Sequence, residues 1–111
     1  MSLAEKHCVA CEGGVDPLSP DAAATMLEQV PGWELVASAT GLARELKFKD
    51  FLASMAFVDQ VADIAEYEGH HPNIHIYYDR VRIELTTYAI SGLSENDFIV
   101  AAKINTLPHS S

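Results

Sequence analysis

Glu66-Tyr67-Glu68-Gly69-His70-His71-Pro72 joins a long helical pattern to a strand pattern, and the rest of the chain is arranged around this junction. Gly69 permits a tight turn there, and Pro72 fixes the direction in which the chain leaves it. Packing alone explains two adjacent histidines at such a junction poorly. We therefore interpret His70 and His71 as the floor of a small-molecule site, held in place by the surrounding scaffold.

The helix before the histidines is predicted to begin after Asp50, a favourable N-cap residue, and to stop at Gly69. Its apolar side chains recur at helical spacing, so we interpret them as part of the core. They are Phe51, Leu52, Met55, Val58, Val61, Ala62 and Ala65.

Two strands with alternating apolar residues follow Pro72, over residues 74–78 and 81–86, and they leave Asp79-Arg80 as a two-residue turn. This register places Tyr78 opposite Val81. Extended along the same ladder it places His71 opposite Tyr88, with Cβ atoms roughly 4.5–5.5 Å apart. His75 falls on the polar face, and we interpret it as a solvated strand histidine.

The remaining elements complete the predicted fold. Ser19-Pro20 is typical of a helix start, and Ser94-x-x-Asp97 resembles a capping box that opens a last helix. Two strands, residues 33–38 and 42–48, flank a turn at Gly41. The resulting order, α-β-β-α-β-β-α, predicts an α+β fold in which a four-stranded antiparallel sheet carries its helices packed on one face.

The length of 111 residues favours one domain, and a hydrophobic share of 49% is enough for a sizeable core. We expect an irregular N-terminal arm over residues 1–18 and a single domain over residues 19–111. Sixteen acidic residues against seven basic ones give a net charge of −9, which argues against a nucleic-acid or anionic-membrane surface. No apolar run reaches membrane-spanning length and no signal peptide opens the chain, so we expect a cytoplasmic protein.

Cys8 and Cys11 are the two cysteines of the chain, too few for a disulfide-built domain. A closed zinc site needs four ligands, and nothing in the sequence places His7 or His109 beside the pair. Two reduced cysteines in a terminal segment are the favoured interpretation.

Histidine is the side chain best suited to proton transfer near neutral pH, and two of them can divide the work of transferring a proton and orienting a substrate. Glu66 precedes His70 by four residues, one helical turn, so it can orient an imidazole or bind a polar substrate edge. Spacing alone supports a structural interpretation equally well, in which one histidine caps the helix, the other is exposed to solvent and Glu66 is solvated. A metal site built from His70, His71 and His75 is disfavoured, because adjacent histidines diverge on a strand.

These motifs together resemble the pterin-4a-carbinolamine dehydratase family, from about Leu18 to Asn105. Trp33 and the arm around Cys8 also fit, the arm being similar to a bacterial branch. The motifs that carry the resemblance are Glu66-x-x-x-His70-His71-Pro72, Tyr78, Gly92-Leu93-Ser94-Glu95-Asn96-Asp97-Phe98, Pro31-Gly32-Trp33 and Phe48-Lys49-Asp50-Phe51.

The resemblance implies dehydration of a 4a-hydroxytetrahydropterin to quinonoid dihydropterin, the step that recycles the pterin of aromatic amino-acid hydroxylases. It implies no metal or organic cofactor, and assembly into a homodimer or homotetramer. By position, His70 is the expected acid/base and His71 an assisting group, while Glu66 contacts the pterin or orients a group in its site. Pro72 and Thr87 complete the expected substrate-binding set. Asp97 matches the family's acidic position, and we expect it to cap a helix.

Tyr88 departs from the family pattern, which usually has a third histidine after a threonine at this place, here Thr87. A phenol loses its proton only at about pH 10, so tyrosine is a poor proton shuttle at neutral pH. Slower dehydration, a different substrate and a lost activity all fit the substitution.

Members of the family also act as binding proteins, as a dimerisation cofactor for a homeodomain transcription factor or as carboxylase assembly factors. His70-His71-Pro72 favours the enzyme, whereas Tyr88 favours a protein partner.

Overall fold

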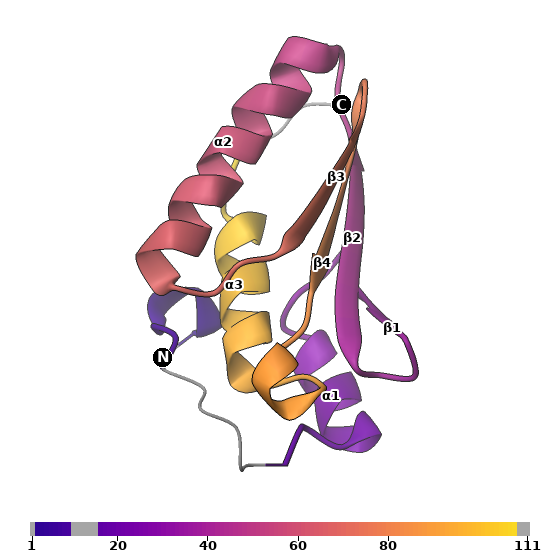
Figure 1. The fold of residues 1–111 in the computed structure, drawn as a ribbon, viewed down its shortest axis with the longest axis vertical. Helices are drawn as coiled ribbons and strands as arrows, with labels where there is room; N and C mark the ends of the chain where they lie inside the picture. Colours follow the sequence, from indigo (N-terminus) through magenta and orange to yellow (C-terminus); the bar gives the residue numbers. More distant parts are fainter. Residues whose placement is uncertain (1, 10–15, 109–111) are drawn as a thin grey trace.

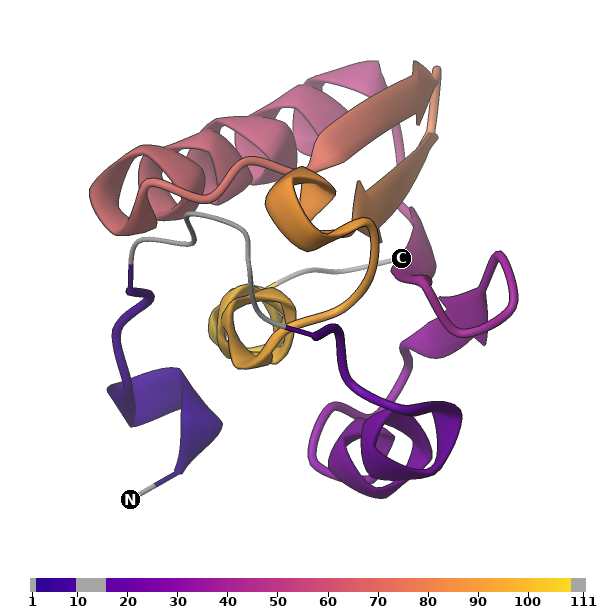
Figure 2. The same cartoon turned by 60° about the horizontal axis from the view of Figure 1, so that its bottom comes forward.

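The computed structural model describes residues 2–9 and 16–108, and in them it confirms the predicted α+β fold (Figure 1). The sheet is antiparallel with strand order β1-β2-β4-β3. Figure 2 shows the three α-helices on one side of the sheet. The elements are η1 (Leu3–Glu5), α1 (Pro20–Leu27), β1 (Glu34–Val36), β2 (Gly41–Lys47), α2 (Phe51–Glu68), β3 (Asn73–Tyr77), β4 (Arg80–Leu85), η2 (Tyr88–Ile90) and α3 (Glu95–Asn105), where η denotes a 3-10 helix.

The predicted capping residues set the ends of the helices. The Ser19 hydroxyl accepts a hydrogen bond from the Ala22 N–H, and the Asp50 carboxylate accepts one from the Ala53 N–H at 2.8 Å. α2 ends at Gly69, whose φ of 67° lies in the left-handed region. Since His70 follows directly, this glycine sets where the chain turns from the helix towards the sheet. No helix among the described residues is both long and apolar enough to span a membrane.

Gly69 offers a test of this turn. A Cβ built on Gly69 has no other atom within 4 Å, so a substitution there costs conformational energy alone. We expect Gly69→Ala to lower the free energy of unfolding by about 1 kcal/mol, measured by urea denaturation. Gly69→Asn should cost less, because asparagine tolerates the left-handed region better. Equal losses in the two variants would contradict this explanation.

The core lies between the sheet and the helices, and the prediction for α2 was partly wrong. Leu52 is 78% exposed, and Phe51 and Ala62 are also exposed. Leu52 and Ala62 are rotated away from the face that packs against the sheet, and Phe51 lies at the exposed start of the helix. That face carries the residues that are buried, Ser54, Phe57, Val61 and Ala65.

The turn between β3 and β4 lies at Tyr78-Asp79, so the predicted Asp79-Arg80 turn and its register were wrong. Tyr77 pairs with Arg80 and Ile76 with Val81. Tyr78 takes a positive φ of 58°. A tyrosine in a sequence does not predict this backbone conformation, which few residues other than glycine adopt. Because the register moves by two residues, each side chain keeps its predicted face but changes its partner.

The expected pairing of His71 with Tyr88 was wrong for the same reason. The β3–β4 ladder ends at the pair of Asn73 and Glu84. Tyr88 lies beyond the strand, at the start of η2. The first hairpin also turns earlier than predicted, over residues 37–40, and Gly41 begins β2.

Candidate active site

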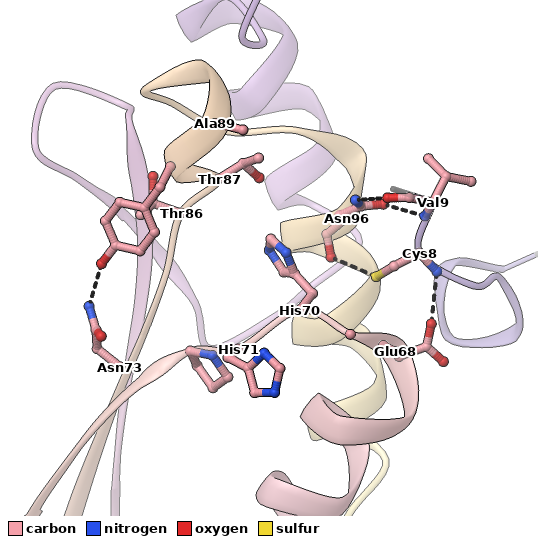
Figure 3. Close-up of a pocket in the computed structure, with 13 residues that line it drawn as sticks. Cys8, Val9, Glu68, His70, His71, Asn73, Thr86, Thr87, Ala89 and Asn96 are labelled. Atoms are coloured by element: carbon pink, nitrogen blue, oxygen red, sulfur yellow. Dashed lines mark hydrogen bonds between the residues drawn. The ribbon is translucent and has the colours of Figure 1, made fainter. Parts of the chain in front are cut away.

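A cavity of about 670 Å³ opens where the end of α2 meets the ends of β3 and β4 and the start of α3 (Figure 3). This volume is within the range of small-molecule sites. Five of the six residues expected at the site line it: His70, His71, Pro72, Thr87 and Tyr88. Glu66 is not among its lining residues and reaches the site only through His71, as described below.

His70 is held by a buried carboxylate. Its Nε2 lies 2.6 Å from Oδ1 of Asp97, which is 0% exposed. Oδ2 of Asp97 accepts hydrogen bonds from the Thr87 hydroxyl at 2.7 Å and from the Ser94 N–H at 3.0 Å. A buried carboxylate is stable only when its oxygens are hydrogen-bonded in this way. Asp97 therefore links the start of α3 to the end of β4 and to His70.

The expected capping role of Asp97 is confirmed, but it is only half of what the residue does. The capping box with Ser94 uses Oδ2, which leaves Oδ1 for the imidazole. A signal for this second role was present in the sequence, because the motif that resembles the family contains this acidic position. Local pattern alone could not reveal that the aspartate lies beside a histidine 27 residues away.

The hydrogen bond to Asp97 selects one tautomer of a neutral His70. The Asp97 carboxylate has no proton to donate, so the Nε2 of a neutral His70 carries the hydrogen and donates it. The Nδ1 lone pair is then left for a ligand in the cavity. An imidazole held in this way can act as a base at Nδ1 and, once protonated, as an acid.

His71 and Glu66 form a second pair at the mouth of the site. Nε2 of His71 lies 2.5 Å from Oε2 of Glu66, and both side chains are largely exposed. The carboxylate thus orients His71 and not His70, one of the two roles left open by the spacing. A solvated imidazole at the rim can exchange protons with water as well as contact a ligand.

Tyr88 is 70% exposed, and its hydroxyl oxygen accepts a hydrogen bond from the Asn73 amide at 2.8 Å. The phenolic hydrogen therefore stays available to a ligand. Asn73 fixes the position of the ring from the start of β3, which sequence reasoning missed. Such a phenol can orient a polar group, and it replaces the imidazole expected at this position.

Cys8 also lines the cavity, but its thiol is unreactive. Burial, together with the negative charge of Glu68, raises the pKa of the Cys8 thiol to about 12, so the sulfur stays protonated at neutral pH. Cys11 and His109 lie outside the described residues. Within the described part of the chain, no cluster of three or more His, Cys, Asp or Glu side chains is arranged to hold a metal ion. His75 lies on the exposed polar face of β3, as predicted, and pairs with Glu84.

The fold and the site together define an α+β protein with a cavity that is lined by a histidine bound to a buried aspartate, a second histidine and a phenol. Residues 16–107 match the model of the family described as pterin 4 alpha carbinolamine dehydratase. The chain therefore belongs to the pterin-4a-carbinolamine dehydratase family.

Individual relatives agree with this family assignment. The chain is 45% identical over 107 residues to a protein of Halorhodospira halophila named "Putative pterin-4-alpha-carbinolamine dehydratase", covering 96% of this chain and 98% of the relative. It is 44% identical over 106 residues to a protein of the same name from Methylococcus capsulatus, covering 96% and 93%.

Two solved structures are also similar. A transcriptional coactivator/pterin dehydratase from Brucella melitensis matches with a TM-score of 0.76 and 33% identity, over 81% of this chain and 96% of that one. A pterin dehydratase-like protein identified as a RuBisCO assembly factor in the alpha-carboxysome matches with a TM-score of 0.58 and 25% identity, over 67% and 86%.

Proposed function

We propose that this protein dehydrates a 4a-hydroxytetrahydropterin to quinonoid dihydropterin, and so serves the recycling of a tetrahydropterin. The observation that carries the proposal is the contact between His70 and the buried Asp97 inside a cavity of ligand size. Family membership and the names of the relatives support the substrate class.

The reaction needs two proton transfers. In a carbinolamine one carbon bears both a hydroxyl group and an amine nitrogen. Dehydration breaks the C–O bond, removes the N–H proton and forms a C=N bond, while the hydroxyl leaves as water after it has gained a proton. His70 is assigned one of these transfers through Nδ1, with Asp97 stabilising the imidazolium that forms.

His71 is assigned the complementary proton, since it lies at the solvent-exposed mouth of the same cavity and is oriented by Glu66. Thr87 and Tyr88 are assigned to position the pterin, and Pro72 to shape the cavity floor. The steps use proton transfer alone, so no metal or organic cofactor is assigned.

The direct test is stopped-flow dehydration of a freshly generated 4a-carbinolamine, with the uncatalysed rate subtracted. We expect protein-dependent formation of the quinonoid product that saturates with substrate. Dehydration no faster than the uncatalysed rate at any protein concentration would overturn the proposal.

Tyr88→His tests the departure from the family pattern. An imidazole in this position adds a group that transfers protons at neutral pH, so we expect kcat to rise by about tenfold. Tyr88→Phe serves as the matched control, because it keeps the ring and removes only the hydroxyl that meets Asn73. A Tyr88→His variant slower than wild type would show that the phenol is the better group here.

The second candidate function is that of a protein-binding factor without catalysis. Tyr88 favours it, as do the coactivator and assembly-factor roles named for the two structural relatives. A wild-type protein that lacks dehydration, but gains it in Tyr88→His, would support this candidate. A purified partner should then bind wild type and His70→Ala with the same Kd.

We also propose that the protein forms a homodimer or homotetramer through the open edge of β3. Among the described residues β3 is an edge strand, Ile76 and Tyr77 are exposed on it, and such an edge is a surface for pairing with another strand. Sedimentation equilibrium should show the oligomer, and Ile76→Lys should shift it towards the monomer. A wild-type protein that sediments as a monomer at all concentrations would contradict this assembly.

A further inference from the structure

Residues 2–9, here called the docked segment, lie against the folded domain although they precede the part matched by the family model. Leu3 is buried in the hydrophobic core, and Lys103 on α3 donates a hydrogen bond to the Ala4 carbonyl at 2.8 Å. These contacts fix the beginning of the segment against α3 and the core. Its other end reaches the cavity, where Cys8 and Val9 are lining residues.

Two side chains hold that end in place. The Asn96 amide donates to the Val9 carbonyl at 2.7 Å and accepts from the Val9 N–H at 3.1 Å. Glu68, with a side chain 2% exposed, accepts the Cys8 N–H at 2.8 Å and lies 3.0 Å from His7. Figure 3 shows both attachments beside His70.

The ionisation of Glu68 favours this attachment. Burial by itself raises the pKa of a carboxyl group, but here the hydrogen bonds from the Cys8 N–H and from His7, with the nearby Lys103, hold the pKa of Glu68 below its ordinary value. Glu68 is therefore charged at neutral pH, and charge-assisted hydrogen bonds are the stronger kind.

The two sides of the cavity differ in chemistry. On the side of the docked segment, the Asn96 amide and the Glu68 carboxylate are occupied in holding the segment, and the other lining residues there are Val9, 74% exposed, and Cys8 with its neutral thiol. Thr86 and Asn73 lie on the other side of the two histidines (Figure 3). A pterin has a matching asymmetry: its amino and oxo groups lie on the pyrimidine ring, and its substituent is on C6 of the other ring.

We propose that the docked segment is the specificity wall of the site, where Val9, held by Asn96, sets the size of the C6 substituent that the cavity accepts. The pyrimidine edge then faces the polar side, and the C6 end faces Cys8 and Val9. The inference rests on the proposed pterin function, but it concerns binding and does not require turnover.

The experiment compares two stable ligands, 6-methyl-7,8-dihydropterin and 7,8-dihydrobiopterin, by isothermal titration calorimetry. We expect Val9→Trp to weaken binding of the larger ligand about tenfold more than binding of the smaller one. Ala24→Trp, an exposed position on α1 remote from the cavity, controls for an added surface tryptophan and should change neither Kd. Equal changes for both ligands in Val9→Trp, or no change for either, would overturn the inference.

Asn96→Ala gives an independent arm, because it releases Val9 without touching the Asp97 network. We expect the Kd ratio of the two ligands to move towards one and amide exchange of residues 7–9 to accelerate. Faster exchange with an unchanged ratio would overturn the inference. If the wild type bound the ligands by size but showed no dehydration, the inference about Val9 would be supported and the proposed dehydratase activity would be rejected. Failure to bind either ligand would reject both.

Discussion

His70→Ala is expected to lower kcat for carbinolamine dehydration by about 10²–10⁴-fold, the usual contribution of one positioned acid/base group. The variant removes the imidazole whose Nε2 is bound to Asp97 and whose Nδ1 makes no hydrogen bond to another described residue. Water that enters the vacated space cannot reproduce an oriented base of matched strength. KM should change little, since most of the residues that line the cavity are unchanged.

His75→Ala is the matched control for that loss. His75 also pairs with a carboxylate, Glu84 at 3.1 Å, but it lies on the exposed face of β3 and does not line the cavity. Its removal should leave kcat unchanged. Stopped-flow rates for both variants, with folding checked by circular dichroism, distinguish loss of the catalytic imidazole from loss of any histidine. If His70→Ala kept more than half of the wild-type kcat, the assignment of His70 would be wrong.

The fold was predictable from local signals that act over a few residues. Asp50 and Gly69 mark the ends of α2 because capping depends only on neighbouring backbone groups. The alternation along β4 gave the buried face, which survived a register error of two residues. The turn itself was missed because Tyr78 adopts a positive φ, which no local preference of tyrosine predicts.

The candidate site was predictable where its residues are adjacent in sequence, and not where distant segments meet. His70 and His71 stood out as a pair at an element junction. The contacts that complete the site join residues far apart: Asp97 to His70, and Asn96 to Val9, 87 residues away. Packing decides such contacts, so helical and strand periodicities carry no information about them.

Asp97→Asn is expected to lower kcat on the order of 10²-fold, because it reverses the hydrogen bond that sets the protonation of His70. If the amide oxygen keeps the bonds to Thr87 and Ser94, the amide NH₂ takes the place of Oδ1 and donates to His70 Nε2. A neutral imidazole must then carry its hydrogen on Nδ1, where the proposed reaction needs a lone pair. The free energy of unfolding should fall by about 1–3 kcal/mol through the weakened network.

Ring ¹⁵N NMR spectra distinguish this positioning role from a loss of stability, since they report which nitrogen of His70 is protonated. We expect hydrogen on Nε2 in the wild type and on Nδ1 in Asp97→Asn. Asp21→Asn, which removes an exposed carboxylate from the first turn of α1, should change neither the spectrum nor kcat. If Asp97→Asn lost stability and activity but kept hydrogen on Nε2, the carboxylate would be a structural link between α3 and β4, and another group would have to set the protonation of His70.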